Sequence, residues 1–314
     1  MHRRAIATAP ASIANLGPLF DLAALAVEAF RDRVEVEVVE ELGSGIRVEV
    51  EAEGAPGGKA NTAYAAAYRL LEYLGETLHV RIRVEKRVPP GRGLGSSGAT
   101  AAATVYALNM LLGEPFTREE LIRFAGEAEA VAAGAPHFDN VAASLLGGLV
   151  VLLDRERPLA AKLELPQDVR LLLFIPEGDV VKVPEGMGKT EAMRSVIPHE
   201  VETRACIGWM EKALRLTVGL GVDPYLALQA ANYGGPVEAA RSRLIPGYNE
   251  AKRVALEAGA IAFNISGAGP SLFAIVREDS VEEVRRRVTR VLEKSWGRLS
   301  VVETGPDEEG ARLE

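Results

Sequence analysis

The chain has 314 residues, of which 48% are hydrophobic and 25% are charged. That composition is ordinary for a globular protein with a buried core, and the length predicts about two domains. The 44 acidic residues outnumber the 36 basic ones, which gives a net charge of −8 and argues against a nucleic-acid-binding protein.

Cys206 is the single cysteine, so an intrachain disulfide and a cysteine-based zinc site are both excluded. The uncharged stretch at residues 93–113 is long enough to span a membrane, but its glycine, serine, threonine and alanine content favours a buried helix. The N-terminus lacks the apolar segment of a signal peptide. We therefore expect a cytoplasmic protein that binds neither nucleic acid nor a membrane.

Period-two alternation predicts strands at residues 33–40, 46–51 and 80–88, and helical spacing predicts helices at 61–74, 97–112 and 117–133. Thr117 and Glu120 have the spacing of a capping box at the start of the last helix. Residues 144–153 are typical of a buried helix end that leads into a strand. The charged, proline-containing segment 154–166 predicts the domain boundary, which we place between residues 160 and 161.

Beyond that boundary, the pattern predicts a strand at 170–175, two or three helices within 190–231 and a helix at 248–258. Strands at 261–266 and 271–276 follow, joined by GAGP, then a helix at 281–292 and a strand at 298–303. The polar tail, residues 307–314, is expected to be disordered. Because strands and helices do not alternate strictly, the pattern favours the α+β class over a doubly wound parallel sheet.

The strongest local signal is PPGRGLGSSGATAAA, residues 89–103, between a predicted strand and a predicted helix. Glycines let backbone N–H groups approach an anion, and the positive end of the helix dipole points to the same place. Ser96 and Ser97 add hydroxyls, one of which could ligate Mg²⁺ beside a phosphate. The segment therefore predicts a phosphate-binding loop.

Other interpretations of this loop compete with that one. Gly93, Gly95 and Gly98 also satisfy G-x-G-x-x-G, so a dinucleotide-dependent dehydrogenase is a distant alternative. Pro89 and Pro90 separate the loop from its strand, and no acidic residue follows at the end of a second strand, which argues against it. A Walker-type loop is excluded because no Gly-Lys-Ser/Thr closes the run. A plain glycine-rich helix start stays open.

This loop resembles the second motif of the small-molecule kinases named after galactokinase, homoserine kinase, mevalonate kinase and phosphomevalonate kinase. Residues 9–27 (APASIANLGPLFDLAALAV) resemble the first motif, and residues 264–276 (NISGAGPSLFAIV) resemble the third. Within that superfamily, residues 135–152 (APHFDNVAASLLGGLVVL) and 242–260 resemble the homoserine kinase branch. Three motifs in order over most of the chain make the resemblance specific.

The resemblance implies an α+β fold of two domains. Residues 1–160 would form an ATP-binding domain with a left-handed βαβ unit, and residues 161–314 a ferredoxin-like domain. ATP and Mg²⁺ are the implied cofactors, and the implied reaction transfers the γ-phosphate of ATP to the hydroxyl of L-homoserine, a step towards threonine. A superfamily kinase acting on another small alcohol, such as shikimate or mevalonate, is the alternative. A homodimer is common in the superfamily.

The resemblance also assigns residues to the nucleotide and to the metal. The nucleotide residues are Asn61, Lys86, Pro89, Pro90, Gly91, Arg92, Gly93, Leu94, Gly95, Ser96, Ser97 and Gly98. For Asn61, a helix N-cap is an equally good interpretation. Mg²⁺ falls to Ser97 and Glu129, and one hydroxyl plus one carboxylate suits the hard octahedral preference of that ion.

An amino-acid substrate needs arginine for its carboxylate and an acidic or carbonyl oxygen for its ammonium. By the same resemblance, the substrate residues are Asn15, Asp21, His137, Arg194, Arg241 and Gly267. Asp21 interrupts an apolar run, LFDLAALA, where an unpaired carboxylate is costly, and this alone favours a functional role.

The catalytic residues that the resemblance implies are Asn140, Asp139 and Arg194. Some superfamily relatives use an aspartate as general base at this place, whereas homoserine kinases align an asparagine with it. Our hypothesis is direct attack by the substrate hydroxyl, which Asn140 orients while Asp139 holds the loop, since a loose transition state places little demand on a base. Leu19 and Ala24 stand where the family usually has glycine, and we expect them to reshape the loop beside the substrate.

Overall fold

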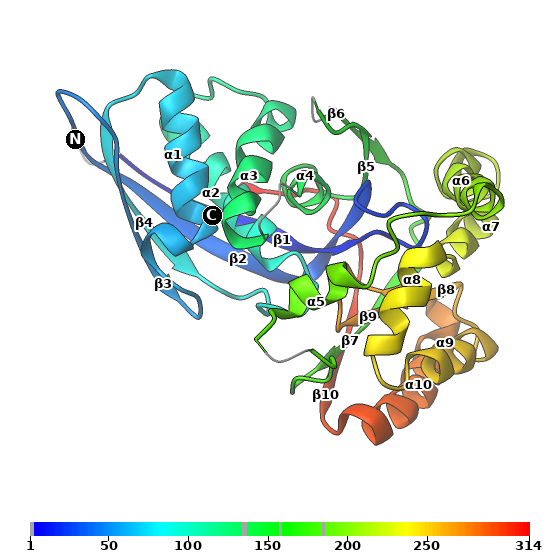
Figure 1. Ribbon diagram of the computed structural model, residues 1–314. Helices are drawn as coiled ribbons and strands as arrows, with labels where there is room; N and C mark the ends of the chain where they lie inside the picture. The colour runs from blue at the N-terminus through cyan, green and yellow to red at the C-terminus, as the bar shows by residue number, and fades with distance from the viewer. Residues whose placement is uncertain (1–2, 134–136, 157–158, 184–185) are drawn as a thin grey trace.

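The computed structural model describes residues 3–133, 137–156, 159–183 and 186–314. These residues form two β-sheets, each with its own covering helices, and the two halves lie side by side (Figure 1). This arrangement confirms the α+β class and the two-domain organisation that the sequence predicts.

The first sheet has seven strands and is built around one long strand, β2. Five strands follow the order β11-β1-β2-β4-β3, while β5 pairs with the early part of β2, and β6 pairs with β5. The strands are β1 Arg3–Ala14, β2 Ala23–Glu41, β3 Arg47–Glu53, β4 Leu78–Glu85, β5 Leu149–Asp154, β6 Leu159–Leu163 and β11 Arg312–Leu313. β3 and β4 are parallel neighbours joined by a helix, and they form the βαβ unit expected from the resemblance.

Four helices cover this sheet: α1 Thr62–Leu74, α2 Ser96–Leu111, α3 Arg118–Ala133 and α4 Phe138–Leu146. α2 packs against the sheet and against the other three helices, which leaves it buried nearly all round. Its alanines permit that close approach, and a helix that is apolar on every side is a buried one. Among the described residues, no helix has the length and apolar character needed to cross a bilayer. The capping box of α3 is confirmed, since Thr117 and Glu120 exchange side-chain to backbone hydrogen bonds.

The second sheet has the strand order β10-β7-β9-β8, in which all neighbours are antiparallel. Its strands are β7 Val169–Pro176, β8 Ala262–Ile265, β9 Leu272–Arg277 and β10 Leu299–Thr304. The helices of this half are α5 Lys189–Ser195, α6 Thr203–Thr217, α7 Pro224–Leu228, α8 Gly235–Arg241, α9 Tyr248–Glu257 and α10 Val281–Trp296. The order 4-1-3-2, with helices in both crossovers, confirms the ferredoxin-like fold.

Both faces of the second sheet are buried, which explains the continuous apolar run at residues 171–175. Leu172 and Phe174 face α9 and α10, whereas Leu171 and Leu173 face a core shared with the first sheet. Because successive side chains of a strand point to opposite faces of the sheet, one set of β7 side chains packs within its own domain and the other set packs at the domain interface. That shared core holds the two halves together around the cleft described below.

The two ends of the chain differ from what the sequence pattern predicts. β1 is a strand without polar alternation, because its small side chains are buried on both faces. The tail at residues 307–314 is ordered, so the prediction of disorder is wrong: Ala311 is fully buried, β11 pairs with β1, and Asp307 forms an ion pair with Arg31. These partners lie almost a whole chain away, where no local pattern can reveal them.

The domain boundary predicted between residues 160 and 161 falls inside β6, which belongs to the first sheet. Sheet membership changes between β6 and β7. After β10 the chain returns to the first sheet through the tail.

Candidate active site

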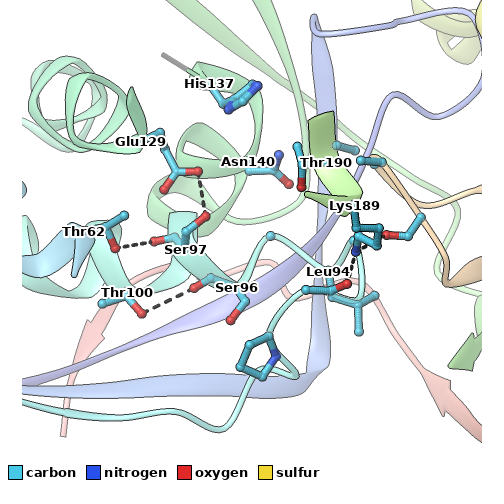
Figure 2. Close-up of a pocket in the computed structure, with 18 of the residues that line it drawn as sticks. Thr62, Leu94, Ser96, Ser97, Thr100, Glu129, His137, Asn140, Lys189 and Thr190 are labelled. Carbon is cyan, nitrogen blue, oxygen red and sulfur yellow. Dashed lines mark hydrogen bonds between the residues drawn. The ribbon is translucent and has the colours of Figure 1, made fainter. Parts of the chain in front are cut away.

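A cavity of about 310 Å³ lies between the two halves, and all three sequence motifs open into it. The predicted site residues that line it are Asn15, Asp21, Asn61, Lys86, Pro90, Gly91, Gly93, Leu94, Gly95, Ser96, Ser97, Glu129, His137, Asp139, Asn140, Arg194, Arg241 and Gly267. Figure 2 shows part of this lining, with side chains from α2, α3, α4 and α5 converging on one space.

At one end of the cavity, a glycine-rich loop leads into α2. Gly95 is the N-cap of this 16-residue helix and has no side chain to accept from the first helical amides, so these remain available to an anion. Neighbouring segments hold the loop: Ser12 N donates to Leu94 O (3.1 Å), and Ser266 Oγ donates to Gly93 O (2.6 Å). The second motif is thereby fixed by the first and third motifs.

A buried ion pair supports the loop from below. The Lys86 ammonium bonds Asp32, Ser96 O (2.6 Å) and Thr100 Oγ1 (2.8 Å), while burial lowers the pKa of Lys86. The two oxygens of Asp32 also accept from the amides of Arg87 and Val88 and from the Thr100 hydroxyl. Since its three N–H donors have three partners, Lys86 supports the loop, and its contact with the nucleotide stays a prediction.

Ser97 and Glu129 face each other across the start of α2 (Figure 2), where Ser97 Oγ donates to Glu129 Oε2 at 2.8 Å. Glu129 is 4% exposed, and burial raises its pKa to about 7. Its other oxygen, Oε1, is buried without a hydrogen-bond partner among the described residues. An unpartnered carboxylate oxygen beside a hydroxyl and a phosphate-binding loop fits a hard divalent cation. Of the two serines, Ser97 is the one whose hydroxyl faces Glu129, since Ser96 Oγ donates to Val88 O instead.

At the other end of the cavity, three charged side chains from distant segments meet. Asp21 follows β1, Arg194 is on α5 and Arg241 ends α8; Arg194 Nη2 lies 3.6 Å from Asp21 Oδ2. Arg241 is 3% exposed and donates to Met193 O and Gly267 O, both at 3.0 Å. Burial lowers the pKa of Arg241 to about 10, and Arg194 adds to that effect while Asp21 opposes it. Two guanidinium groups and one carboxylate thus share a small space in which Arg241 is buried and Asp21 and Arg194 are partly buried.

Asn15 and His137 complete this end. Asn15 Nδ2 donates to Gly267 O (3.0 Å), and its Oδ1 accepts from the amide of Asp21 (3.0 Å), which joins the first motif to the third. His137 Nε2 is hydrogen-bonded to Arg194, and burial followed by the charge of Arg194 lowers the pKa of this histidine. A neutral ring can accept from the guanidinium and orient it.

Asp139 and Asn140 begin α4 between the two ends. Asn140 Oδ1 accepts from Ser12 Oγ (2.8 Å), and its amide nitrogen lies 3.3 Å from Asp139 Oδ1. Asp139 Oδ1 also accepts from the backbone amide of Asn140 (2.8 Å). Asp139 is 3% exposed, and burial, reinforced by the charge of Asp21, raises its pKa to about 7. Asn140 is thus held from both sides with one amide hydrogen left over.

Comparison with known proteins agrees with this geometry. The profiles of the GHMP kinase N-terminal and C-terminal domains match residues 61–148 and 210–294. The chain belongs to the GHMP kinase family.

Among similar proteins, the homoserine kinases of Pyrobaculum islandicum and Aeropyrum pernix are each 38% identical to this GHMP kinase. The alignments cover 90% and 93% of this chain and 91% and 92% of those relatives. The crystal structure of homoserine kinase from Cytophaga hutchinsonii superimposes with a TM-score of 0.86 at 28% identity, covering 99% of this chain and 98% of that one. Membership establishes an ATP-dependent kinase that acts on a small molecule.

Three predicted nucleotide residues do not line the cavity of this GHMP kinase. Arg92 turns away to donate to Glu177 O (2.9 Å) and Gly178 O (2.8 Å), and Gly98 packs against the side chains of Asn140 and Val141. Pro89 is also outside the lining. The loop therefore offers its middle, residues 90–97, to a ligand.

Asn61 is both a helix N-cap and a residue of the cavity lining, the two interpretations that the sequence left open. Its side chain caps α1 by accepting from Ala63 N (2.9 Å), and it lines the cavity. Leu19 and Ala24 are buried in hydrophobic cores and do not line the cavity, so their effect on the loop beside the substrate stays a prediction.

Sequence reasoning missed Lys189 and Thr190 on α5 and Thr62 and Thr100 on α1 and α2, all of which line the cavity. Thr62 Oγ1 donates to Ser97 O (3.3 Å), so it supports the proposed metal ligand. A usable signal existed for Thr190, because it stands one helical turn before Arg194, which was singled out.

Proposed function

We propose that this GHMP kinase phosphorylates L-homoserine, giving ADP and O-phospho-L-homoserine, a step towards threonine. The observation that carries the proposal is the meeting of Asp21 with Arg194 and Arg241 at the end of the cavity opposite the glycine loop. An amino acid brings one carboxylate for the guanidinium groups and one ammonium for Asp21. The names of the relatives support the same substrate.

The charges at this end also argue against the alternative acceptors. Mevalonate and shikimate carry a carboxylate but no ammonium, so binding either one would leave Asp21 desolvated and without a cationic group from the substrate. Galactose has neither charge and would leave all three groups unmatched. A dinucleotide-dependent dehydrogenase is not favoured, because the loop belongs to a kinase fold rather than to a parallel doubly wound sheet.

We propose that the loop at residues 90–97 and the first amides of α2 hold the triphosphate, with Mg²⁺ at Ser97 and Glu129. When bound, that ion offsets negative charge on the phosphate oxygens. The unpartnered Oε1 of Glu129 supports the metal assignment. Glu129 must be ionised to ligate, and its raised pKa makes metal binding dependent on pH near neutrality.

For the transfer itself, we propose that Asn140 orients the substrate hydroxyl with its free amide hydrogen. The hydroxyl oxygen forms a bond to the γ-phosphorus, the bond from that phosphorus to the leaving oxygen of ADP breaks, and the hydroxyl proton passes to solvent. Asp139 holds Asn140 in place. Arg194, kept in orientation by His137, places the substrate in line with the phosphate.

We also propose a cytoplasmic enzyme, which the single cysteine supports, with an ATP-binding domain followed by a second domain. Because β6 pairs within the first sheet, the boundary predicted between residues 160 and 161 moves to the segment between β6 and β7.

A homodimer is our proposal for the assembly. It is supported by an apolar row on α6 and the turn after it, Ile207, Met210, Leu214 and Val218, each more than half exposed. Sedimentation should give a dimer for the wild type and a monomer for Leu214→Glu.

The direct test of function is ADP formation by the purified protein with ATP and Mg²⁺. L-homoserine, shikimate, mevalonate and galactose are offered in separate assays, with an assay lacking any acceptor as control. Turnover with homoserine alone is the expected result. Turnover with another acceptor would keep the kinase and overturn the substrate.

A further inference from the structure

Lys189 is the first residue of α5, and its ammonium lies where the second and third motifs meet. It donates to the carbonyl oxygen of Gly91 in the glycine loop and to that of Gly269 (2.8 Å) in the third motif. Lys189 also lines the cavity, and Figure 2 shows it reaching the loop that carries Leu94. One flexible cation thus bridges the two loops at the phosphate end.

The surroundings of this ammonium lack a matching negative charge. No ion pair of the described residues includes Lys189, and its two partners are neutral carbonyls. Burial, together with the positive charge of Arg92, lowers the pKa of Lys189 to about 8, and the charge of Asp179 opposes this. Asp179 is fully exposed and 3.7 Å from Arg92. A partly desolvated cation with no anion beside a phosphate-binding loop is costly unless a ligand supplies the charge.

We propose that Lys189 is a catalytic residue that binds the γ-phosphate of ATP and stabilises the charge on the phosphoryl group during its transfer. This rests on the proposed nucleotide site at residues 90–97. When the triphosphate enters, the ammonium leaves the two carbonyls for a γ-phosphoryl oxygen. It stays protonated throughout, so the bond that forms, the bond that breaks and the path of the hydroxyl proton are as stated above.

The position of Lys189 suits this role better than a purely structural one. A lysine is a compact point charge on a flexible stem, which can exchange two carbonyl partners for one phosphate without moving the backbone. Arg194 lies on the same short helix and binds at the acceptor end. α5 therefore presents one cation to the phosphate that is transferred and another to the substrate that receives it.

The test compares the binding of Mg–ADP with that of the non-hydrolysable β,γ-imido analogue of ATP. In Lys189→Met, we expect the analogue to bind about 10- to 30-fold more weakly and ADP to bind within twofold of wild type, because only the analogue has a γ-phosphate. With homoserine, kcat should fall about 100-fold. Lys182→Met removes an exposed lysine from the preceding segment and should change none of these values.

Lys189→Arg supplies a second readout. In the wild type, kcat/KM for ATP should fall as the pH rises through about 8, when the ammonium of the free enzyme loses its proton. Arginine stays charged, so this variant should keep part of the activity and lose that decline. The other charged groups facing the site, Arg92 and Asp179, are unchanged in it.

If Lys189→Met weakened the binding of ADP and of the imido analogue by the same factor, or changed neither, the role proposed for Lys189 would be overturned. Such a result would make the residue a structural bridge between two loops. Failure of the wild-type protein to bind either nucleotide is a different outcome. It would overturn the proposed nucleotide site itself. Homoserine-dependent ADP formation by the wild type distinguishes this outcome from a failure of the Lys189 proposal alone.

Discussion

The two ends of the active-site cavity are built in opposite ways. At the phosphate end, one contiguous run within residues 90–97 supplies seven of the lining residues, and neighbouring segments hold that run in place. At the acceptor end, Asp21, His137, Arg194 and Arg241 come from four separate parts of the chain and offer side-chain charges. The phosphate end depends on the shape of the backbone, whereas the acceptor end depends on the charges of side chains.

This contrast follows from what each end has to recognise. A triphosphate presents the same oxygens to every kinase. A fixed concave arrangement of backbone N–H groups is therefore sufficient to bind it, and one short sequence motif can supply that arrangement. An acceptor must be told apart from other small alcohols, which requires unlike charges at set positions. Changes of backbone shape should therefore damage the first end most, and changes of charge the second.

The largest effect is expected from Gly95→Ala. Gly95 has a φ of 64°, and a Cβ atom there would clash with Ser12 Oγ and lie 2.8 Å from Asn140 Oδ1. The substitution should displace both the loop and Asn140, and kcat/KM should fall about 1,000-fold. Gly91→Ala is the matched control, since its φ is also positive, at 67°, but no atom lies within 4 Å of the added carbon. A similar loss in both variants would show that backbone strain, not the clash, is responsible.

Asn140 connects the two ends, and its removal comes next. Asn140→Ala should lower kcat about 100- to 1,000-fold because the hydroxyl loses its orienting donor, while Asp139→Asn should keep kcat within about tenfold. Steady-state kinetics at saturating ATP and homoserine measure both. The reverse pattern, with Asp139→Asn inactive, would make Asp139 the general base. Its pKa of about 7 would suit that role.

At the acceptor end, Asp21→Asn isolates a single charge. Asp21 has a φ of 54°, which asparagine tolerates well, so the backbone should be preserved. KM for homoserine should rise about 100-fold, with KM for ATP unchanged. A sharper readout uses 4-hydroxybutanoate, which is homoserine without its amino group. The wild type should prefer homoserine over it strongly, and Asp21→Asn should lose most of that preference. Persistence of the preference would place the ammonium elsewhere.

The smallest effect concerns stability. Burial raises the pKa of Glu129 from 4.5 to about 7, so between those values the unfolded chain releases its proton first, and the free energy of unfolding falls as the pH rises. Glu129→Gln removes this cost. Without Mg²⁺ at pH 8, it should be more stable than wild type by roughly 1–3 kcal/mol, yet inactive. Urea unfolding at pH 4 and pH 8 measures the difference, which should shrink at the lower pH.

The sequence predicts the phosphate end well because its determinants are local. The glycines, the hydroxyls of Ser96 and Ser97 and the following helix are adjacent in the chain, so their joint meaning can be read from spacing. Spacing alone could not tell which serine faces Glu129, because that depends on the packing of α2 against α3; only the resemblance indicated Ser97. The ion pair of Lys86 could not be predicted for a similar reason, since its partner Asp32 lies on a strand 54 residues away.

The acceptor end could be assigned only by resemblance. Nothing in the spacing of Asp21, Arg194 and Arg241 indicates that they meet, since the meeting depends on how α5 and α8 sit against the first motif. Lys189 was missed because no local pattern distinguishes it from a surface lysine. The ferredoxin-like sheet was easier, because β7, β8 and β9 are short and mostly apolar, and the sequence pattern indicates all four strands.

The return of β11 to the first sheet has a consequence for how the chain folds during synthesis. β1 leaves the ribosome long before one of its two neighbours, residues 312–313. Until residues 312–313 are synthesised, β1 has an unpaired edge. The Arg31 guanidinium is solvated until Asp307 is available to form the ion pair. The first half cannot finish folding ahead of the second, so the two halves should mature as one cooperative unit, with long-range contacts that slow the process. A nascent chain arrested before residue 306 would carry a nearly complete loop for the phosphates on an unfinished sheet.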